Sequence, residues 1–369
     1  MKICIVHEYL IDFGGAEQVL KGLLELWPNA PIFTLIYDEN GNCKDIIEST
    51  EVTGSFLNKW PFSKRKPRAY LPLMPLAIEQ FDLSGYDIVI SASHAIAKGV
   101  ITGPDQLHIS YLHTPMRYAW DMQAAYLSDA GLEKGLRSLI TRSLLHYLRI
   151  WDMRTAAGVD HYIANSQFIA QRIMKLYKRE AAVIHPPVEI DRFKVREDKE
   201  DFYVTVSRLV SYKRVDLIVR AFNQIPNRKL VVMGDGPELK SLKATAASNI
   251  TFTGFQSDRV IEDTLQRARA FVYAAQEDFG IVPVEAQACG TPVIAYGKGG
   301  VLETVVPGET GQFFYRQTDE ALIETIEDFE GSQPFDPHII RKNAERFSKA
   351  RFKREMQAFV AGKAQDYFG

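Results

Sequence analysis

Short runs of apolar and β-branched residues alternate along the chain with longer segments in which apolar residues recur every three or four positions. Most of the short runs are apolar throughout, which is typical of parallel strands covered on both faces. Strands that alternate with helices predict βαβ units and an open α/β sheet. The predicted strands are residues 2–7, 32–37, 87–92, 107–112, 161–165, 182–185, 202–206, 229–233, 250–253, 270–274, 292–295 and 311–314.

Two prolines, Pro186 and Pro187, divide the chain almost in half. A pair of prolines fits neither a helix interior nor a central strand, so it predicts a linker. We therefore expect an α/β protein of two Rossmann-like domains that face each other across a cleft, residues 1–185 and residues 186–345. A C-terminal helix in residues 346–369 is expected to cross back to the first domain.

The composition narrows the class of protein. With 46% hydrophobic and 24% charged residues among 369, the chain reads as globular, which excludes disorder, collagen and coiled coil. Lys and Arg number 44 against 46 Asp and Glu, so the basic surplus expected of a nucleic-acid-binding protein is missing. Three scattered cysteines form neither a disulfide framework nor a CxxC metal pair, which fits a reducing compartment.

The N-terminal segment does not resemble a signal peptide. Its apolar run, residues 3–6, is too short, and Glu8 and Asp12 follow closely. No apolar run approaches the roughly 18–20 residues of a membrane span. We therefore expect a cytoplasmic protein, with peripheral contact at the inner face of the plasma membrane left open.

A basic segment, residues 59–68, interleaves cations with Trp60 and Phe62. Such a segment is able to dock on anionic lipid headgroups or to grip a lipid-diphosphate acceptor, and a solvated loop is an equally good interpretation. Its cations are Lys59, Lys64, Arg65, Lys66 and Arg68.

A second basic stretch, residues 137–154, has apolar residues at helical spacing. It is predicted to form an amphipathic helix, and packing against the core accounts for its apolar side chains. These side chains are Leu139, Ile140, Leu144, Leu145 and Leu148.

Ligands of open α/β sheets bind at the carboxyl ends of the strands, so the loops there carry the candidate chemistry. Gly14 and Gly15 lie between the first strand and a predicted helix. Glycines let the backbone approach a ligand, and a helix N-terminus offers N–H groups to an anion. The dinucleotide pattern GxGxxG is absent here, and a plain tight turn explains the pair equally well.

Two cations follow the strand at 202–206. Arg208 is expected at the end of the strand and Lys213 near the start of the next helix, so both are expected to point into one crevice. Arg offers a planar fork to phosphate oxygens and Lys a movable point charge. Together they would hold a diphosphate and stabilise it as a leaving group. The alternative is a pair of solvated surface cations.

The segment from Glu277 to Glu285 is the most specific feature of the sequence. Gly280 permits close backbone approach, and the N–H groups of residues 280–282 (Gly280, Ile281, Val282) lie at a predicted helix N-terminus. The two carboxylates are expected to face one ligand. Glu285 on a buried helix needs a partner, for which a ribose diol is suitable; Glu277 alternatively caps the turn.

His113 ends the strand at 107–112 and is expected to open into the cleft. An isolated histidine is more often structural, but its place at the carboxyl end of a strand favours function. Arg117 lies nearby and is suited to an acceptor phosphate or to the donor; both readings stay open.

The spacing of Glu277 and Glu285 resembles the E-x7-E motif of retaining glycosyltransferases with the GT-B fold, and the continuation to Val293 resembles family 4. Residues 111–120 resemble a bacterial subgroup of family 4, the WbaZ-like mannosyltransferases of O-antigen and exopolysaccharide assembly. Further matches, in order within residues 204–314, are Val206–Leu209 with Lys213, Gly234–Glu238, Gly299–Glu303 and Gly308–Gly311.

The resemblance implies a role for each matching residue. It implies that Arg208 and Lys213 bind the donor diphosphate, that Glu285 holds the ribose and that Glu277 meets the donor sugar at the reacting face. His113 is implied to reach the donor sugar. The backbone groups implied to contact the donor are those of Gly280, Ile281 and Val282 at the sugar and phosphates, Gly254 and Phe255 at the nucleobase, and Gly14 and Gly15 in a loop that closes on the donor.

The resemblance also implies a reaction, the transfer of a hexose with retention of configuration. The chain contains no D-x-D triplet, so neither a metal nor another cofactor is expected, and the cations would neutralise the leaving group. We expect GDP-mannose as donor, with UDP-glucose or another UDP-sugar as the alternative. The expected acceptor is a glycan on a polyprenyl diphosphate in cell-surface polysaccharide synthesis. A sugar-binding protein without catalysis is a more distant alternative, disfavoured by the paired cations.

Overall fold

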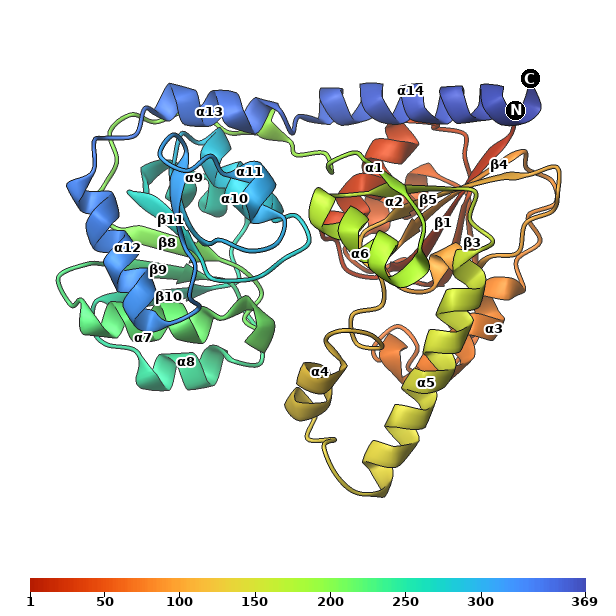
Figure 1. Cartoon of the computed structure of the whole chain (residues 1–369), viewed down its shortest axis with the longest axis horizontal. Helices are drawn as coiled ribbons and strands as arrows, with labels where there is room; N and C mark the ends of the chain where they lie inside the picture. Colours follow the sequence, from red (N-terminus) through yellow and green to blue (C-terminus); the bar gives the residue numbers. More distant parts are fainter. The chain divides into compact units, whose positions relative to one another are not determined.

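The computed structural model describes all residues from 1 to 369 and divides them into two compact units. Unit 1 comprises Met1–Pro187 and Phe352–Gly369, and unit 2 comprises Val188–Arg351. Each unit is a parallel sheet with helices on both faces (Figure 1). The predicted α/β class is therefore confirmed for both halves of the chain.

Unit 1 contains a seven-stranded sheet in the order β3-β2-β1-β4-β5-β6-β7. Every residue of β4 and β5 is buried, which explains why these strands are mostly apolar; their few polar residues are serines and one histidine. The strands are β1 (Ile3–Leu10), β2 (Ile32–Tyr37), β3 (Val52–Gly54), β4 (Ile88–Ser93), β5 (Leu107–Leu112), β6 (His161–Ala164) and β7 (Ala181–Val183). The helices are α1 (Gly15–Leu26), α2 (Lys44–Ser49), α3 (Met74–Glu79), α4 (Gln123–Asp129), α5 (Leu136–Ala156), α6 (Gln167–Tyr177) and α14 (Lys349–Phe368), with short 3₁₀ turns η1 (Phe56–Lys59), η2 (Pro67–Leu73) and η3 (Ala97–Gly99).

The last helix, α14, packs on α1 in the core of unit 1. Phe352 and Met356 are fully buried there with Leu20 and Leu23. Gly22 of α1 is necessary for this contact, because a Cβ at that position would lie 2.8 Å from the Phe352 ring. The C-terminal segment therefore completes the unit formed by the first half of the chain.

Unit 2 contains a six-stranded sheet in the order β10-β9-β8-β11-β12-β13. Helices α9 and α10 cover one face, and α7 and α12 cover the other. The strands are β8 (Tyr203–Val206), β9 (Leu230–Met233), β10 (Ile250–Gly254), β11 (Ala270–Tyr273), β12 (Val293–Tyr296) and β13 (Gly311–Phe314). The helices are α7 (Val215–Gln224), α8 (Leu239–Thr245), α9 (Asp258–Arg267), α10 (Ile281–Ala288), α11 (Val301–Thr304), α12 (Asp319–Gly331) and α13 (Pro337–Glu345), with turns η4 (Ile190–Arg192) and η5 (Ser211–Lys213).

Both sheets reverse their strand order at one point. In unit 1 the chain runs from β1 outward through β2 to β3, and then returns to place β4 on the other side of β1. In unit 2 it runs from β8 through β9 to β10 and returns to place β11 on the other side of β8. A crevice forms outside the carboxyl ends of the strands at such a reversal, and ligands bind there in open α/β sheets. The fold therefore singles out the loops after β1, β4 and β5 in unit 1 and after β8 and β11 in unit 2.

The structure corrects the prediction for residues 137–154. Leu145 and Leu148 of α5 are buried as expected, but Leu139 and Ile140 are 62% and 61% exposed. Packing against the core therefore explains only one side of this helix. None of the helices in the chain combines the length and the apolar character needed to cross a bilayer.

A buried ion pair joins α5 to the loop after β4. Lys98 and Asp152 are both fully buried, with Nζ 2.7 Å from Oδ1. The second carboxylate oxygen accepts hydrogen bonds from Trp120 Nε1 at 2.7 Å and from the Tyr177 hydroxyl at 2.9 Å. The Lys98 ammonium also donates to the Thr155 hydroxyl at 3.0 Å. Four separate segments of unit 1 thus meet at one carboxylate.

We expect Lys98→Met to destabilise unit 1 by about 3–5 kcal/mol, because it leaves the Asp152 charge buried without its cation. All four tryptophans, Trp27, Trp60, Trp120 and Trp151, belong to unit 1, so tryptophan fluorescence during urea unfolding reports on this unit. Lys44→Met is the matched control, since the exposed Lys44–Glu48 pair is worth about 0.5 kcal/mol or less. Equal losses in the two variants would contradict the prediction.

Candidate functional site

A buried carboxylate organises the carboxyl end of the unit 1 sheet. Glu8 lies near the end of β1 and is completely buried. Its Oε1 atom accepts hydrogen bonds from the backbone N–H groups of residues 95–97 at 2.8–3.0 Å and from the Ser93 hydroxyl at 2.9 Å. A buried charge requires such donors because burial without them is strongly unfavourable. Glu8 therefore holds the loop after β4 around itself.

His94 is the charged partner of this carboxylate, with Nδ1 3.0 Å from Glu8 Oε2. Burial is the largest single effect and lowers the pKa of His94, but the charge of Glu8, its hydrogen bond and the charge of Glu17 together raise this pKa. Burial alone raises the pKa of Glu8, whereas the charge of His94 and its hydrogen bond hold that pKa well below its usual range. The His94 side chain is 38% exposed, so its ring is accessible to solvent.

The glycine loop of unit 1 is closed by the side chain of Glu17. One Glu17 oxygen accepts a hydrogen bond from the Gly14 N–H at 2.8 Å, and the other lies 3.1 Å from His7 Nε2. Gly15 is the first residue of α1. Because the Gly14 N–H is already bonded within the loop, any N–H group offered to a ligand comes from the first turn of α1.

His113 lies at the end of β5, as the sequence predicted. Its backbone is held on both sides, by a hydrogen bond from its N–H to Ser93 O at 2.7 Å and one from Asn165 Nδ2 to its carbonyl at 3.0 Å. The ring is buried, and Nε2 has no hydrogen-bond partner in the protein. Burial, followed by the positive charges of His94 and His7, lowers the pKa of His113 to about 3. The ring is therefore neutral at pH 7, and its Nε2 is a buried nitrogen without a protein partner.

The basic segment at 59–68 presents aromatic side chains to solvent. Trp60 and Phe62 are 43% and 71% exposed, and they line a hollow of about 380 Å³ with Lys64. Lys64 also pairs with Asp38 at 3.5 Å. Arg117 lies elsewhere in the unit, where its Nε donates to the Thr114 hydroxyl at 3.4 Å. The remaining predicted cations of the segment, Arg65, Lys66 and Arg68, are exposed.

In unit 2 the structure brings Lys213 against Glu277, which links the loops after β8 and β11. The Lys213 ammonium donates to Glu277 Oε1, and the Tyr273 hydroxyl donates to the other oxygen. Both oxygens are thus held, and the two charged side chains remain 15% and 20% exposed. Arg208 is exposed to solvent at the end of β8. The site therefore contains a fixed carboxylate with an accessible ammonium beside it.

Two glycine contacts shape the loop that carries Glu277. A Cβ on Gly300 would lie 2.3 Å from Asp278 O, and the Gly300 N–H donates to Glu277 O at 2.9 Å. Gly280 has a φ of +89°, which lets the chain turn directly into α10. The N–H groups of Ile281 and the following residues therefore begin the helix next to this carboxylate, as the spacing predicted.

Glu285 has a protein partner that sequence reasoning did not supply. It lies buried on α10, and Arg192 NH2 is 3.6 Å from its Oε1. Burial raises the pKa of Glu285 to about 7, and Arg192 offsets only part of this effect because Asp258 and Glu262 add negative charge. The expectation that a ribose diol is the partner of Glu285 is therefore incomplete, since an arginine already contacts it.

The loop predicted to line a nucleobase lies at the end of β10. Gly254 has a φ of +69°, and its carbonyl accepts a hydrogen bond from the Gly234 N–H at 2.9 Å. Phe255 is 82% exposed and has room to stack on a planar ring. Gly234 in turn touches the loop after β8, where a Cβ on Gly234 would lie 1.9 Å from Ser207 O. The loops after three adjacent strands are thus in direct contact.

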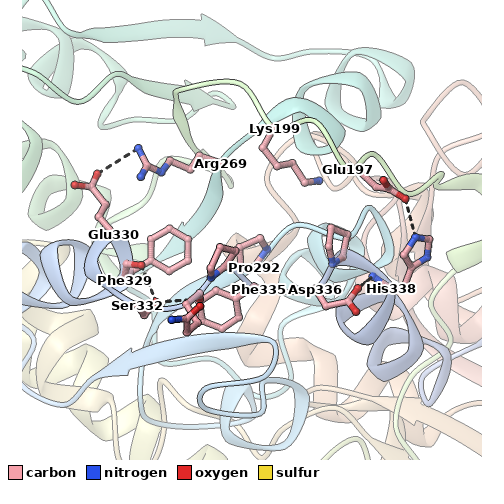
Figure 2. Close-up of a pocket in the computed structure, with 14 residues that line it drawn as sticks. Glu197, Lys199, Arg269, Pro292, Phe329, Glu330, Ser332, Phe335, Asp336 and His338 are labelled. Carbon is pink, nitrogen blue, oxygen red and sulfur yellow. Dashed lines mark hydrogen bonds and ion pairs between the residues drawn. The ribbon is translucent and has the colours of Figure 1, made fainter.

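Unit 2 contains a hollow of about 590 Å³ (Figure 2). It lies at the amino-terminal ends of the strands, away from Glu277, and beside the residue that precedes β11. That residue, Arg269, lies 3.7 Å from Glu330, and His338 pairs with Glu197 at 2.9 Å. Lys199 donates three hydrogen bonds to protein oxygen atoms. Because these charges are satisfied within the protein, the hollow is a weaker candidate site than the loops around Glu277.

Four site residues were missed from the sequence: Glu8, His94, Tyr273 and Arg192. The predicted first strand ends at residue 7, yet β1 continues to Leu10 and includes Glu8. Tyr273 resembles any other buried strand residue, and Arg192 lies almost 100 residues from Glu285. The protein contains no group of three or more His, Cys, Asp or Glu side chains arranged to hold a metal ion.

Two family models match the chain, and together they cover most of it. Residues 13–192 match the family described as "Glycosyltransferase Family 4", and residues 187–351 match "Glycosyl transferases group 1". Among curated proteins, the D-inositol 3-phosphate glycosyltransferase of Mycobacterium avium (strain 104) is 27% identical over 253 residues, covering 61% of this chain and 57% of that protein. The enzyme of the same name from Mycobacterium bovis (strain BCG / Pasteur 1173P2) is 28% identical, with 61% and 50% covered. The chain thus spans about half the length of these relatives.

Solved structures match over nearly the whole chain at low identity. HepE of Anabaena in complex with UDP has a TM-score of 0.72 at 19% identity, covering 98% of this chain and 100% of that one. Sucrose-phosphate synthase of Thermosynechococcus elongatus has a TM-score of 0.73 at 18% identity, with the same coverage. At such low identity, the similarity to these solved structures shows the fold alone, whereas the family models match the sequence. The chain therefore has the GT-B fold, and its two halves are similar to glycosyltransferases of family 4 and of group 1.

Proposed function

We propose that this protein is a retaining hexosyltransferase that moves a hexose from a nucleoside diphosphate sugar to a hydroxyl group of a glycan acceptor. The observation that carries the proposal is the Lys213–Glu277 pair at the carboxyl ends of β8 and β11. A neutral-sugar-binding protein has no use for an accessible ammonium beside a helix N-terminus. A diphosphate leaving group is stabilised by both an ammonium and helix N–H groups.

The side chains of unit 2 suit the donor. Arg208 and Lys213 would neutralise the charge that develops on the diphosphate as the glycosidic bond breaks, without a metal ion. Glu277, itself held by the Tyr273 hydroxyl, keeps the Lys213 ammonium in a fixed position, which supports catalysis because little reorganisation is needed during the reaction. The N–H groups at the start of α10 would contact the sugar and phosphates. Glu285 would accept hydrogen bonds from the ribose.

The proposed reaction needs no covalent intermediate. Both oxygens of Glu277 are occupied by Lys213 and Tyr273, so this carboxylate is a positioning group in the structure and not a free nucleophile. We propose attack by the acceptor hydroxyl on the same face from which the diphosphate leaves, with a phosphate oxygen taking the proton. His113, neutral and with Nε2 unpartnered, would hydrogen-bond a hydroxyl of the donor sugar.

We propose GDP-mannose as donor, on the resemblance of residues 111–120, and a UDP-sugar as the alternative. HepE structures with UDP and with UDP-glucose support the alternative. For the acceptor we propose a polyprenyl-diphosphate-linked glycan, gripped by Arg117 or by the basic segment at 59–68. The mycobacterial relatives are named D-inositol 3-phosphate glycosyltransferases, and this name supports an acceptor that carries phosphate.

A thermal-shift screen with GDP, UDP and ADP tests the donor proposal. The nucleotide that fits should raise the melting temperature of the protein, and about 2.7 kcal/mol of stabilisation is expected at 100 times its Kd. A shift confined to GDP supports the mannosyl donor, and a shift confined to UDP replaces it with the alternative. No shift with any of the three would contradict a nucleotide-sugar donor.

Glu277→Gln and Lys213→Met should each lower donor turnover by about 100- to 1,000-fold, because each removes one partner of the fixed charge pair. Turnover is measured as release of nucleoside diphosphate from the sugar donor named by the screen. Lys240→Met and Glu309→Gln are the matched controls, since both residues are exposed outside the site. Near-normal rates in both site variants would refute this assignment.

Nucleotide-sugar affinity should improve by about fivefold between pH 6 and pH 8, because Glu285, whose pKa is about 7, ionises in this window and a carboxylate accepts hydrogen bonds more strongly than a carboxylic acid. Calorimetric titration with the intact nucleotide sugar measures the effect, since its diphosphate diester does not titrate there. In Glu285→Gln the affinity should be independent of pH. Ionisation of Glu285 alone should also destabilise the unliganded fold as the pH rises from 4.5 to about 7, with no further loss from this group above that value.

A further inference from the structure

The outward side of α5 presents an apolar stripe that neither the core nor the proposed reaction uses. Five large apolar side chains on this helix are 47–72% exposed, at positions that repeat every three, four or seven residues. At about 100° per residue, this spacing places them on one side of the helix. The core-facing residues Leu145, Leu148 and Asp152 lie on the other side. The stripe consists of Leu136, Leu139, Ile140, Tyr147 and Ile150.

An exposed stripe of this size is uncommon on a soluble protein and marks an interaction surface. The amino-terminal half of α5 extends away from the sheet of unit 1, together with α4, so the rest of the unit does not cover it (Figure 1). With Met153 at its margin, 39% exposed, the stripe continues almost to the end of the helix.

The charges beside the stripe indicate what covers it. Lys134, Arg137 and Arg142 are exposed around the amino-terminal half of the helix and form no ion pair in the structure. The one carboxylate within α5, Asp152, is buried against Lys98 and contributes no negative charge to the surface. The exposed side of α5 is therefore apolar along its centre and cationic along its margins.

We propose that the α5 stripe is a docking surface that lays unit 1 on a bilayer with anionic headgroups. A helix with this distribution lies in the interface, with its apolar side chains among the acyl chains and its cations among the phosphates. A second copy of the chain is a poorer occupant, because two such stripes in contact would bring Arg137 and Arg142 against like charges. The proposal is independent of the donor and gives the membrane-linked acceptor of the proposed function a physical location.

Co-sedimentation with vesicles tests the proposal without any substrate. The protein should bind vesicles that contain phosphatidylglycerol, bind phosphatidylcholine vesicles at least about tenfold more weakly, and lose affinity as salt is raised. Failure to bind phosphatidylglycerol vesicles would overturn the proposal. It would leave the transferase chemistry untouched, since donor binding and turnover are measured in solution.

The variant Leu139→Asp/Ile150→Asp should lower vesicle affinity by about tenfold or more, because it places two charges in the stripe. Both residues are more than half exposed, so the fold should tolerate the change, as unfolding followed by tryptophan fluorescence would verify. The matched control is Leu302→Asp/Ile339→Asp in unit 2, where the same residue types are 51% and 48% exposed. Equal losses of vesicle binding in the two variants would refute a specific role for α5.

Two further outcomes would assign the stripe differently. If Phe62→Asp abolishes vesicle binding while Leu139→Asp/Ile150→Asp does not, the basic segment at 59–68 is the docking surface and the proposal fails. If light scattering shows a dimer that Leu139→Asp/Ile150→Asp converts to a monomer with vesicle binding unchanged, the stripe joins two copies and the proposal fails as well.

Discussion

The buried charge of Glu8 is the constraint on which the arrangement of unit 1 depends. This carboxylate is fully buried at the point where the strand order reverses, and its hydrogen bonds come from Ser93 and the loop after β4. That loop is therefore wrapped around Glu8, which places His94 at the carboxyl end of the central strand β4 and directs Lys98 inward. Lys98 reaches Asp152 and so fixes α5. One buried anion thus connects the candidate site to the helix with the exposed stripe.

Unit 2 reaches a comparable organisation through close backbone contacts instead of a buried charge. Gly234, Gly300 and Gly280 occur where a side chain would collide with a neighbouring loop or where φ is positive. These contacts bring the loops after four strands together, and Lys213 and Glu277 meet as a result. The ion pair is left partly exposed, which is suitable for a site that must accept a charged ligand.

The two sides of α5 show how one helix serves two purposes. Its buried side is specified by the Lys98–Asp152 pair and by Leu145 and Leu148, whose burial stabilises the unit. Its exposed side contributes nothing to the core. Large apolar side chains exposed together in this way mark a surface that a partner covers. The proposed bilayer contact and the proposed lipid-linked acceptor would place the reaction at the same surface.

The sequence by itself determined the fold class and the alternation of strands and helices in βαβ units. It also located the loops that carry Gly280, Glu277 and His113. It could do so because burial on both faces makes the strands mostly apolar, and because local backbone requirements select glycine. Only the tertiary structure revealed the partners: Arg192 beside Glu285, Tyr273 on Glu277 and the donors around Glu8. It also showed that Leu139 faces solvent while Leu145 is buried. Such contacts join residues far apart in the chain, and helical spacing identifies the sides of a helix but not which side the rest of the protein covers.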